Sequence, residues 1–124
     1  MDRAAEVAVV GAGPVGLTLA VLLAQRGRRV AVLERRPDRH AMPRAVHLDD
    51  EAARTLQAAG LGARLEAICE PAPLYEWRNG SGTVLLRLGR PLTAPSGWPA
   101  SSMFHQPDLE ALLEERAGDC GVDL

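Results

Sequence analysis

A glycine-rich segment near the start of the chain has the spacing needed to bind a diphosphate. Residues 11–16 read Gly-Ala-Gly-Pro-Val-Gly and match the pattern G-x-G-x-x-G. In this pattern Gly11 permits a tight turn, Gly13 leaves room for a pyrophosphate beside the backbone, and Gly16 lets a helix pack close to a sheet. The unpaired N–H groups and the dipole at the start of that helix favour an anion. We therefore expect the diphosphate of a dinucleotide to contact Gly11, Gly13, Pro14, Val15 and Gly16.

An acidic residue farther along the chain makes this motif more specific. Glu34 follows Gly16 at close to the spacing of about 20 residues that places a carboxylate on an adenosine ribose. The neighbouring Arg35 is a further candidate for cofactor contact, and together with Arg36 it could favour a 2′-phosphate. Glu34 would repel that phosphate, so FAD or NAD is favoured over NADP. The alternative is that the glycines only shape a turn and that Glu34 is a solvated carboxylate.

The segments around these residues predict a strand, a helix and a second strand. Residues 7–10 and 30–33 are short apolar runs, typical of strands buried in a parallel sheet. Residues 14–26 lie between them and predict a helix that ends near Gly27. This order predicts an α/β, Rossmann-like βαβ fold with a right-handed crossover.

The segment after the second strand predicts a loop and then two helical stretches. Residues 35–47 are rich in arginine and interrupted by prolines, which indicates a loop. Asp49 is expected to cap a helix. The apolar face of that helix is expected to be Ala52, Leu56 and Ala59. The helical pattern resumes after Gly60 and extends to Cys69.

An inserted β-hairpin is predicted in the middle of the chain. Residues 74–78 and 83–88 flank the turn sequence Asn-Gly-Ser-Gly. Tyr75 and Trp77 alternate on the first strand of this hairpin, and we expect them to cover the core.

The last third of the chain predicts a loop, a helix and the beginning of a strand. Residues 89–102 contain three prolines and are expected to form a surface loop, in which Trp98 has no evident role. Pro107 predicts the start of a helix, and residues 122–124 predict another strand. A sheet of this type that lacks its later strands has an open edge, so we expect the chain to be part of a longer protein.

Composition excludes several classes of protein. Of the 124 residues, 47% are hydrophobic and 24% are charged, as in ordinary globular proteins. The net charge of −2 offers no basic surplus for binding nucleic acid. The longest apolar stretch is too short to span a membrane, and His40, His47 and His105 have no metal-ligand spacing. Two widely separated cysteines, Cys69 and Cys120, favour a cytoplasmic location.

Three motifs together resemble those of a known enzyme family. They are residues 9–17 around the glycines, Pro-Arg-Ala-Val-His-Leu-Asp-Asp-Glu at 43–51, and Phe-His-Gln-Pro-Asp-Leu-Glu at 104–110. They resemble the N-terminal part of the single-component FAD-dependent aromatic hydroxylases, and are most similar to the 3-(3-hydroxyphenyl)propionate hydroxylases. The resemblance extends over nearly the whole chain. It implies that residues 1–124 are the N-terminal FAD-binding segment and that the remainder of the FAD domain and the substrate domain are absent.

The same resemblance implies further contacts with FAD. Arg44 would contact the pyrophosphate and ribose, the backbone at Ala45 and Val46 would pass near the isoalloxazine, and Gln106 would reach the cofactor from the start of its helix. The residue types alone leave alternatives, since Arg44 could be a solvated loop residue and Gln106 a polar residue without a ligand. For His47, a surface or packing role is favoured over one near the flavin ring.

The resemblance also implies an activity. The parent enzyme would pass a hydride from NADH or NADPH to FAD and use O₂ to hydroxylate a phenolic substrate, and it could form a homodimer. None of the 124 residues can be assigned as a catalytic acid or base. Two other functions stay open at this point, an isolated dinucleotide-binding module and half of an NAD-dependent dehydrogenase.

Overall fold

The predicted strand–helix–strand unit is present at the start of the chain. The computed structural model describes residues 4–38 and 42–124. Strand β1 (Val7–Val10) and strand β2 (Val30–Leu33) pair in parallel, with Val7 opposite Val30 and Val10 opposite Leu33. Helix α1 (Pro14–Ala24) connects them and ends two residues earlier than predicted. Both strands therefore have their carboxyl ends at the same edge of the sheet, beside the start of α1.

The end of the chain extends this parallel sheet. The N–H of Val32 donates to the carbonyl of Asp123 at 2.7 Å, and the N–H of Asp123 donates to the carbonyl of Val30 at 3.0 Å. Asp123 and Ala31 form a parallel bridge. Residues 122–124 thus pair with β2 on the side away from β1 and begin to extend the sheet, as the sequence predicted.

A second sheet joins three segments that are distant in the sequence. Strand β7 (Ser101–Phe104) lies between β3 (His47–Asp49) and β4 (Cys69–Pro71), and both pairings are antiparallel. The loop predicted at 35–47 is therefore wrong at His47, and the loop predicted at 89–102 is wrong at Ser101 and Ser102. The predicted helix is wrong at Cys69. These three-residue strands have too few residues for a period to be visible in the sequence, and they form because β7 pairs with both of them.

Helix α2 (Asp50–Leu56) continues through a π-helical stretch, η1 (Gln57–Leu61), into helix α3 (Gly62–Ile68). The N-cap prediction is confirmed, because Oδ1 of Asp49 accepts a hydrogen bond from the N–H of Ala52 at 2.8 Å. The predicted apolar face is wrong at Ala52, which is exposed, whereas Ala53 is buried. The reason is that Ala53 and Leu56, three residues apart, share the face that turns toward the core.

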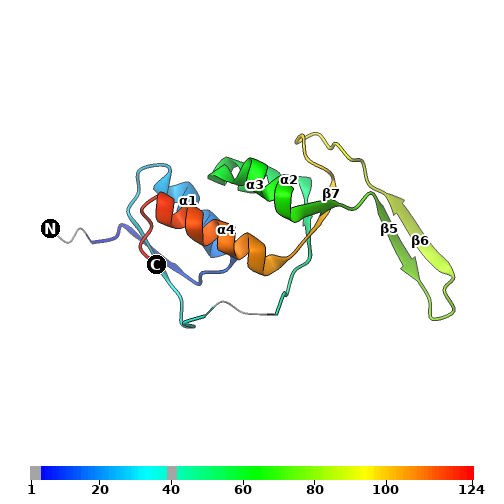
Figure 1. The fold of residues 1–124 in the computed structure, drawn as a ribbon, viewed down its shortest axis with the longest axis horizontal. Helices are drawn as coiled ribbons and strands as arrows, with labels where there is room; N and C mark the ends of the chain where they lie inside the picture. Colours follow the sequence, from blue (N-terminus) through cyan, green and yellow to red (C-terminus); the bar gives the residue numbers. More distant parts are fainter. Residues whose placement is uncertain (1–3, 39–41) are drawn as a thin grey trace.

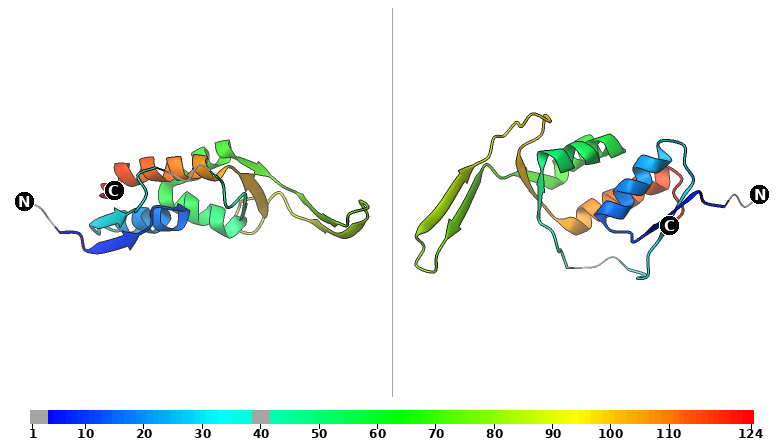
Figure 2. Two further views of the ribbon diagram at one scale, coloured as in Figure 1. Left: turned by 90° about the horizontal axis from the view of Figure 1, so that it is seen from below. Right: turned by 180° about the vertical axis from the view of Figure 1, so that it is seen from behind.

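The hydrophobic core lies between the β1–β2 sheet, α1, the α2–α3 segment and helix α4 (Gln106–Asp119). Helices α1 and α4 run side by side in all views of the ribbon (Figures 1 and 2). The largest fully buried side chains are Leu17, Val21, Leu61, Leu65 and Leu113. This packing fixes the start of α4 relative to the start of α1. In the residues that the structure describes, no helix has both the length and the apolar character needed to cross a lipid bilayer.

The predicted hairpin is formed by β5 (Leu74–Arg78) and β6 (Val84–Gly89), which pair antiparallel. It projects away from the helices (Figures 1 and 2). Tyr75 and Trp77 are 46% and 56% exposed, so the prediction that they cover the core is wrong. Their rings pack edge to face on each other, with centroids 6.3 Å apart. Alternation on a strand shows which side chains share a face, but it does not show whether that face meets the core.

Trp98, without a role in the sequence, is a buried anchor. It is 8% exposed, and its indole N–H donates to Oε1 of Gln57 at 2.7 Å. The loop before β7 is thereby fastened to η1.

Candidate functional site

The glycine motif forms the turn between β1 and α1. Gly11 has φ +106°, a conformation that side chains other than glycine rarely adopt. Its N–H donates to the carbonyl of Leu33 at 2.8 Å, which joins the turn to the end of β2. A Cβ on Gly16 would lie 2.0 Å from the carbonyl oxygen of Gly11. The roles predicted for Gly11 in the turn and for Gly16 in close packing are therefore confirmed.

Gly13 faces open space at the start of α1. It is the N-cap residue, with extended backbone (φ −80°, ψ 179°), and a Cβ there would meet no atom of the described chain within 4 Å. The first hydrogen bond of the helix runs from the N–H of Leu17 to the carbonyl of Gly13. The N–H groups of Val15 and Gly16 precede that bond, so they point toward the same space. An anion can approach the backbone here without a side chain in its way.

Glu34 reaches from the end of β2 to the glycine turn. Its Oε2 accepts a hydrogen bond from the N–H of Ala12 at 2.9 Å, and its Oε1 accepts one from the N–H of Arg36 at 3.0 Å. These bonds lower the pKa of the Glu34 carboxyl below its usual range, and the bond from Ala12 has the larger effect. Glu34 is therefore an exposed, ionised acceptor beside the turn. Its contact with a ribose stays a prediction.

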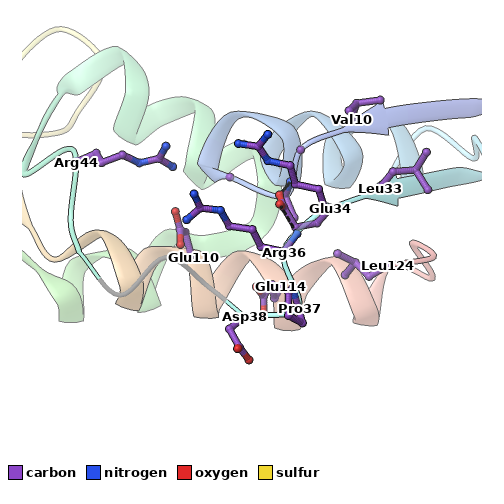
Figure 3. A pocket seen from close by; sticks show the side chains of 14 residues that line it. Val10, Leu33, Glu34, Arg36, Pro37, Asp38, Arg44, Glu110, Glu114 and Leu124 are labelled. Atoms are coloured by element: carbon purple, nitrogen blue, oxygen red, sulfur yellow. Dashed lines mark hydrogen bonds between the residues drawn. The ribbon is translucent and has the colours of Figure 1, made fainter.

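A cavity of about 970 Å³ opens at the carboxyl ends of β1 and β2 (Figure 3). This is the place in parallel α/β sheets where ligands bind, and the volume is near the upper end of the range for small-molecule sites. Arg44 and Arg36 extend into it from opposite sides, as Figure 3 shows. The lining includes Gly11, Ala12, Gly13, Glu34, Arg35, Arg36, Asp38, Arg44, Glu110 and Glu114.

Gln106 holds the loop that carries Arg44. Its Oε1 accepts hydrogen bonds from the N–H groups of Arg44 and Ala45, both at 2.8 Å. Its Nε2 donates to Oε1 of Glu110 at 2.7 Å. Gln106 is only 5% exposed, and its described partners are all protein groups. Its contact with a cofactor therefore stays a prediction.

The structure brings most of the predicted site residues to one cavity. Those that line it are Gly11, Gly13, Glu34, Arg35 and Arg44. Pro14, Val15 and Gly16 form the adjacent first turn of α1. Gln106 accepts hydrogen bonds from the backbone of Arg44 and of its neighbour Ala45. Glu110 was not among the predicted site residues, although its spacing of four residues from Gln106 on a predicted helix indicates that the two side chains share a face.

Two of the three histidines, His47 and His105, have structural partners. Nε2 of His47 lies 2.7 Å from Oγ of Ser101, across the β3–β7 pair, which supports the packing role that was favoured. Nδ1 of His105 lies 3.1 Å from Oδ2 of Asp108. His40 lies outside the described residues. Among the residues described, no three histidine, cysteine, aspartate or glutamate side chains gather in a way that could hold a metal ion.

Comparison of the sequence with known proteins gives consistent matches. The family model described as "FAD binding domain" matches residues 4–124. A probable NADH-specific resorcinol 4-hydroxylase of Rhodococcus jostii strain RHA1 is 42% identical over 113 residues, which are 91% of this chain and 21% of the relative. A 3-(3-hydroxy-phenyl)propionate/3-hydroxycinnamic acid hydroxylase of Comamonas testosteroni is 41% identical over 109 residues, 88% of this chain and 18% of the relative. The chain thus spans about a fifth of the length of these relatives.

Solved structures share the fold. A p-nitrophenol 4-monooxygenase from Pseudomonas putida DLL-E4 superposes with a TM-score of 0.85 at 28% identity, over 99% of this chain and 32% of that one. A ternary complex of aklavinone-11 hydroxylase with FAD and aklavinone superposes with a TM-score of 0.72 at 26% identity, over 99% of this chain and 25% of the hydroxylase.

Proposed function

Because this chain belongs to the FAD binding domain family, we propose that it is the FAD-binding part of an aromatic-ring monooxygenase. The observation that carries the proposal is the cavity at the ends of β1 and β2, which is lined by an open glycine turn, the Glu34 carboxylate and Arg44. The two alternatives, an isolated dinucleotide-binding module and half of an NAD-dependent dehydrogenase, are less well supported, since the relatives described above are named as hydroxylases and a monooxygenase.

The residues of the cavity fit an extended dinucleotide. A diphosphate would lie in the open space before Gly13, close to the first-turn N–H groups of α1. Glu34 would accept hydrogen bonds from the adenosine ribose on one side, beside Arg35. Arg44 would approach the pyrophosphate from the other side, and the backbone at Ala45 would lead toward the isoalloxazine. Gln106 would hold this loop in place through the hydrogen bonds that it accepts from Arg44 and Ala45.

The cofactor supplies the redox chemistry and the protein supplies binding and orientation. FAD, when bound, accepts a hydride from a reduced nicotinamide and supports the use of O₂ for hydroxylation. In this proposal Glu34 and the α1 N-terminus anchor the adenosine half, while Gln106 fixes the loop along which the other half lies. NADH or NADPH as the reductant is supported by the relative named NADH-specific, and a phenolic substrate by the names of the hydroxylases.

A cytoplasmic location and assembly into a homodimer are part of the same proposal. Both cysteines, Cys69 and Cys120, are free thiols, as suits the reducing conditions of the cytoplasm. Assembly into a homodimer would be measured by light scattering of the purified protein.

Titration with FAD and, separately, with NAD tests the proposed function. We expect the chain to quench flavin fluorescence on binding, and calorimetry to give a tighter dissociation constant for FAD than for NAD. A folded chain that binds NAD more tightly, or binds neither, would contradict the proposal. The activity is tested with the protein that carries this segment, by following NADH and NADPH oxidation with resorcinol and with 3-(3-hydroxyphenyl)propionate. Oxidation that no phenol stimulates would count against the hydroxylase assignment.

A further inference from the structure

Two polar side chains are buried together at the start of α4. Gln106 and Glu110 are 5% and 4% exposed, and they lie one helical turn apart. Buried carboxylates are rare unless they have a partner, and here the Nε2 group of Gln106 donates to Oε1 of Glu110 at 2.7 Å. Glu110 also belongs to the lining of the cavity that contains Arg44. None of the roles described so far uses this carboxylate.

The partners of Gln106 require one orientation of its amide. The N–H groups of Arg44 and Ala45 are both donors, and only an oxygen can accept from both of them. The opposite end of the amide must then donate, and Glu110 provides the acceptor. A reversed amide would place oxygen against oxygen at Glu110 and an NH₂ group against two backbone N–H groups.

The loop that Gln106 holds depends on such contacts. Between β2 and β3, the described residues 34–38 and 42–46 form no helix or strand. Backbone N–H groups outside regular structure need side-chain or solvent partners. The two hydrogen bonds that Gln106 accepts connect Arg44 and Ala45 to a helix that starts more than sixty positions later in the chain. They therefore set where the backbone of Arg44 lies at the rim of the cavity.

We propose that Glu110 is a positioning residue: by holding the Gln106 amide in one orientation, it fixes the Arg44–Ala45 backbone for cofactor binding. The relevance to a cofactor rests on the proposed function of the cavity. The positioning itself is a property of the chain without any ligand, which allows the two to be tested separately.

A reciprocal exchange of the two side chains tests this role. Gln106→Glu keeps an acceptor for the two N–H groups but places two carboxylates against each other. The double variant Gln106→Glu/Glu110→Gln restores a donor–acceptor pair with reversed polarity and leaves the net charge of the wild type. We expect the single variant to bind FAD about tenfold more weakly, and the double variant to recover most of that loss.

Amide exchange measured by NMR without FAD gives a second readout. In Gln106→Glu the N–H groups of Arg44 and Ala45 should exchange faster, and in the double variant they should be protected again. The N–H of Ala52 is a matched control, because it also donates to a side-chain oxygen, that of Asp49, at 2.8 Å. Its exchange should be the same in all variants. Should Gln106→Glu fail to fold, Glu110→Gln should still accelerate exchange at Arg44 and Ala45, because a glutamine at 110 can donate as well as accept and so no longer disfavours the reversed amide.

The outcomes separate the two proposals. Unchanged exchange at Arg44 and Ala45 in the single variants, or no recovery in a folded double variant, would overturn the role of Glu110. Accelerated exchange that the double variant reverses, in a chain whose wild type binds no FAD, would uphold the positioning role and reject the proposed function of the cavity.

Discussion

The carboxylate of Glu34 accepts a hydrogen bond from the backbone N–H of Ala12 at 2.9 Å. This bond connects the end of β2 to the middle of the glycine turn, which follows β1. It follows from the parallel register, because Val10 is opposite Leu33 and the residues after them leave the sheet at the same edge. The acid that the sequence assigns to a ribose is thus also a fixed part of the turn that faces the diphosphate.

The ionisation of the Glu34 carboxyl should make FAD binding depend on pH in the acid range. Its two backbone hydrogen bonds lower the pKa of the carboxyl. The ionised carboxylate, with the hydrogen bonds that it accepts, is therefore present above the usual glutamate pKa and is lost as pH falls through the lowered value. We expect FAD affinity to be steady from pH 7 down to the usual glutamate pKa of about 4.3 and to decrease below it. Calorimetric titrations at several pH values measure this.

Glu34→Gln tests whether this pH dependence comes from Glu34 and not from the other carboxylates that line the cavity. It keeps the shape of the side chain but cannot ionise, so it should bind FAD several-fold more weakly at pH 7. Its disadvantage relative to the wild type should shrink as the pH falls. An equal pH dependence of both proteins would show that the Glu34 carboxylate does not contribute.

Gly13→Val should abolish FAD binding without unfolding the chain. The extended backbone of Gly13 accommodates valine, and its Cβ would meet no described protein atom within 4 Å. The added side chain would occupy the space assigned to the diphosphate. Circular dichroism checks the fold, and flavin fluorescence gives the affinity.

Gly89→Val is the matched control for that substitution. Gly89 lies on β6, its φ is outside the left-handed region, and a Cβ there also meets no described atom within 4 Å. This variant should bind FAD like the wild type. Wild-type affinity in Gly13→Val would remove the glycine turn from the site.

Gly16→Ala should destabilise the fold itself. The added Cβ would lie 2.0 Å from the carbonyl oxygen of Gly11, a backbone atom that cannot move without opening the turn. We expect a loss of about 2 kcal/mol in the free energy of unfolding, measured with urea. Gly118→Ala, in the last turn of α4, is the comparison, because its Cβ would meet no described atom within 4 Å. Its stability should equal or slightly exceed that of the wild type, and equal losses in both variants would contradict the steric argument.

The two tryptophans should differ in their contribution to stability. Trp98→Ala removes a buried ring and its hydrogen bond to Gln57, so we expect a loss of about 3 kcal/mol. Trp77→Ala removes an exposed ring on the hairpin, and we expect a loss of less than about 1 kcal/mol. Urea unfolding followed by circular dichroism compares them, and similar losses would show that the hairpin is as important to the fold as the Trp98 loop.

The sequence by itself determined the parts of the protein that depend on neighbouring residues. Apolar runs on either side of the glycine motif predicted β1, α1 and β2, and the spacing to Glu34 placed the acid at the glycine turn. The cap at Asp49 and the hairpin at 74–88 were predicted for the same reason. For the strands, the helix, the cap and the hairpin, the cause is the conformational preference of a few adjacent residues, whereas Glu34 reaches the turn through the parallel pairing of β1 with β2.

Only the tertiary structure decided which distant groups meet. The β3–β7–β4 sheet, the burial of Trp98 and the exposure of Tyr75 and Trp77 depend on how whole elements pack. The same is true of Gln106, whose type fits a cofactor contact but whose amide bonds to Arg44, Ala45 and Glu110. Local pattern sets the direction in which a side chain leaves its own element, whereas the packing of α4 against the rest of the core determines what that side chain reaches.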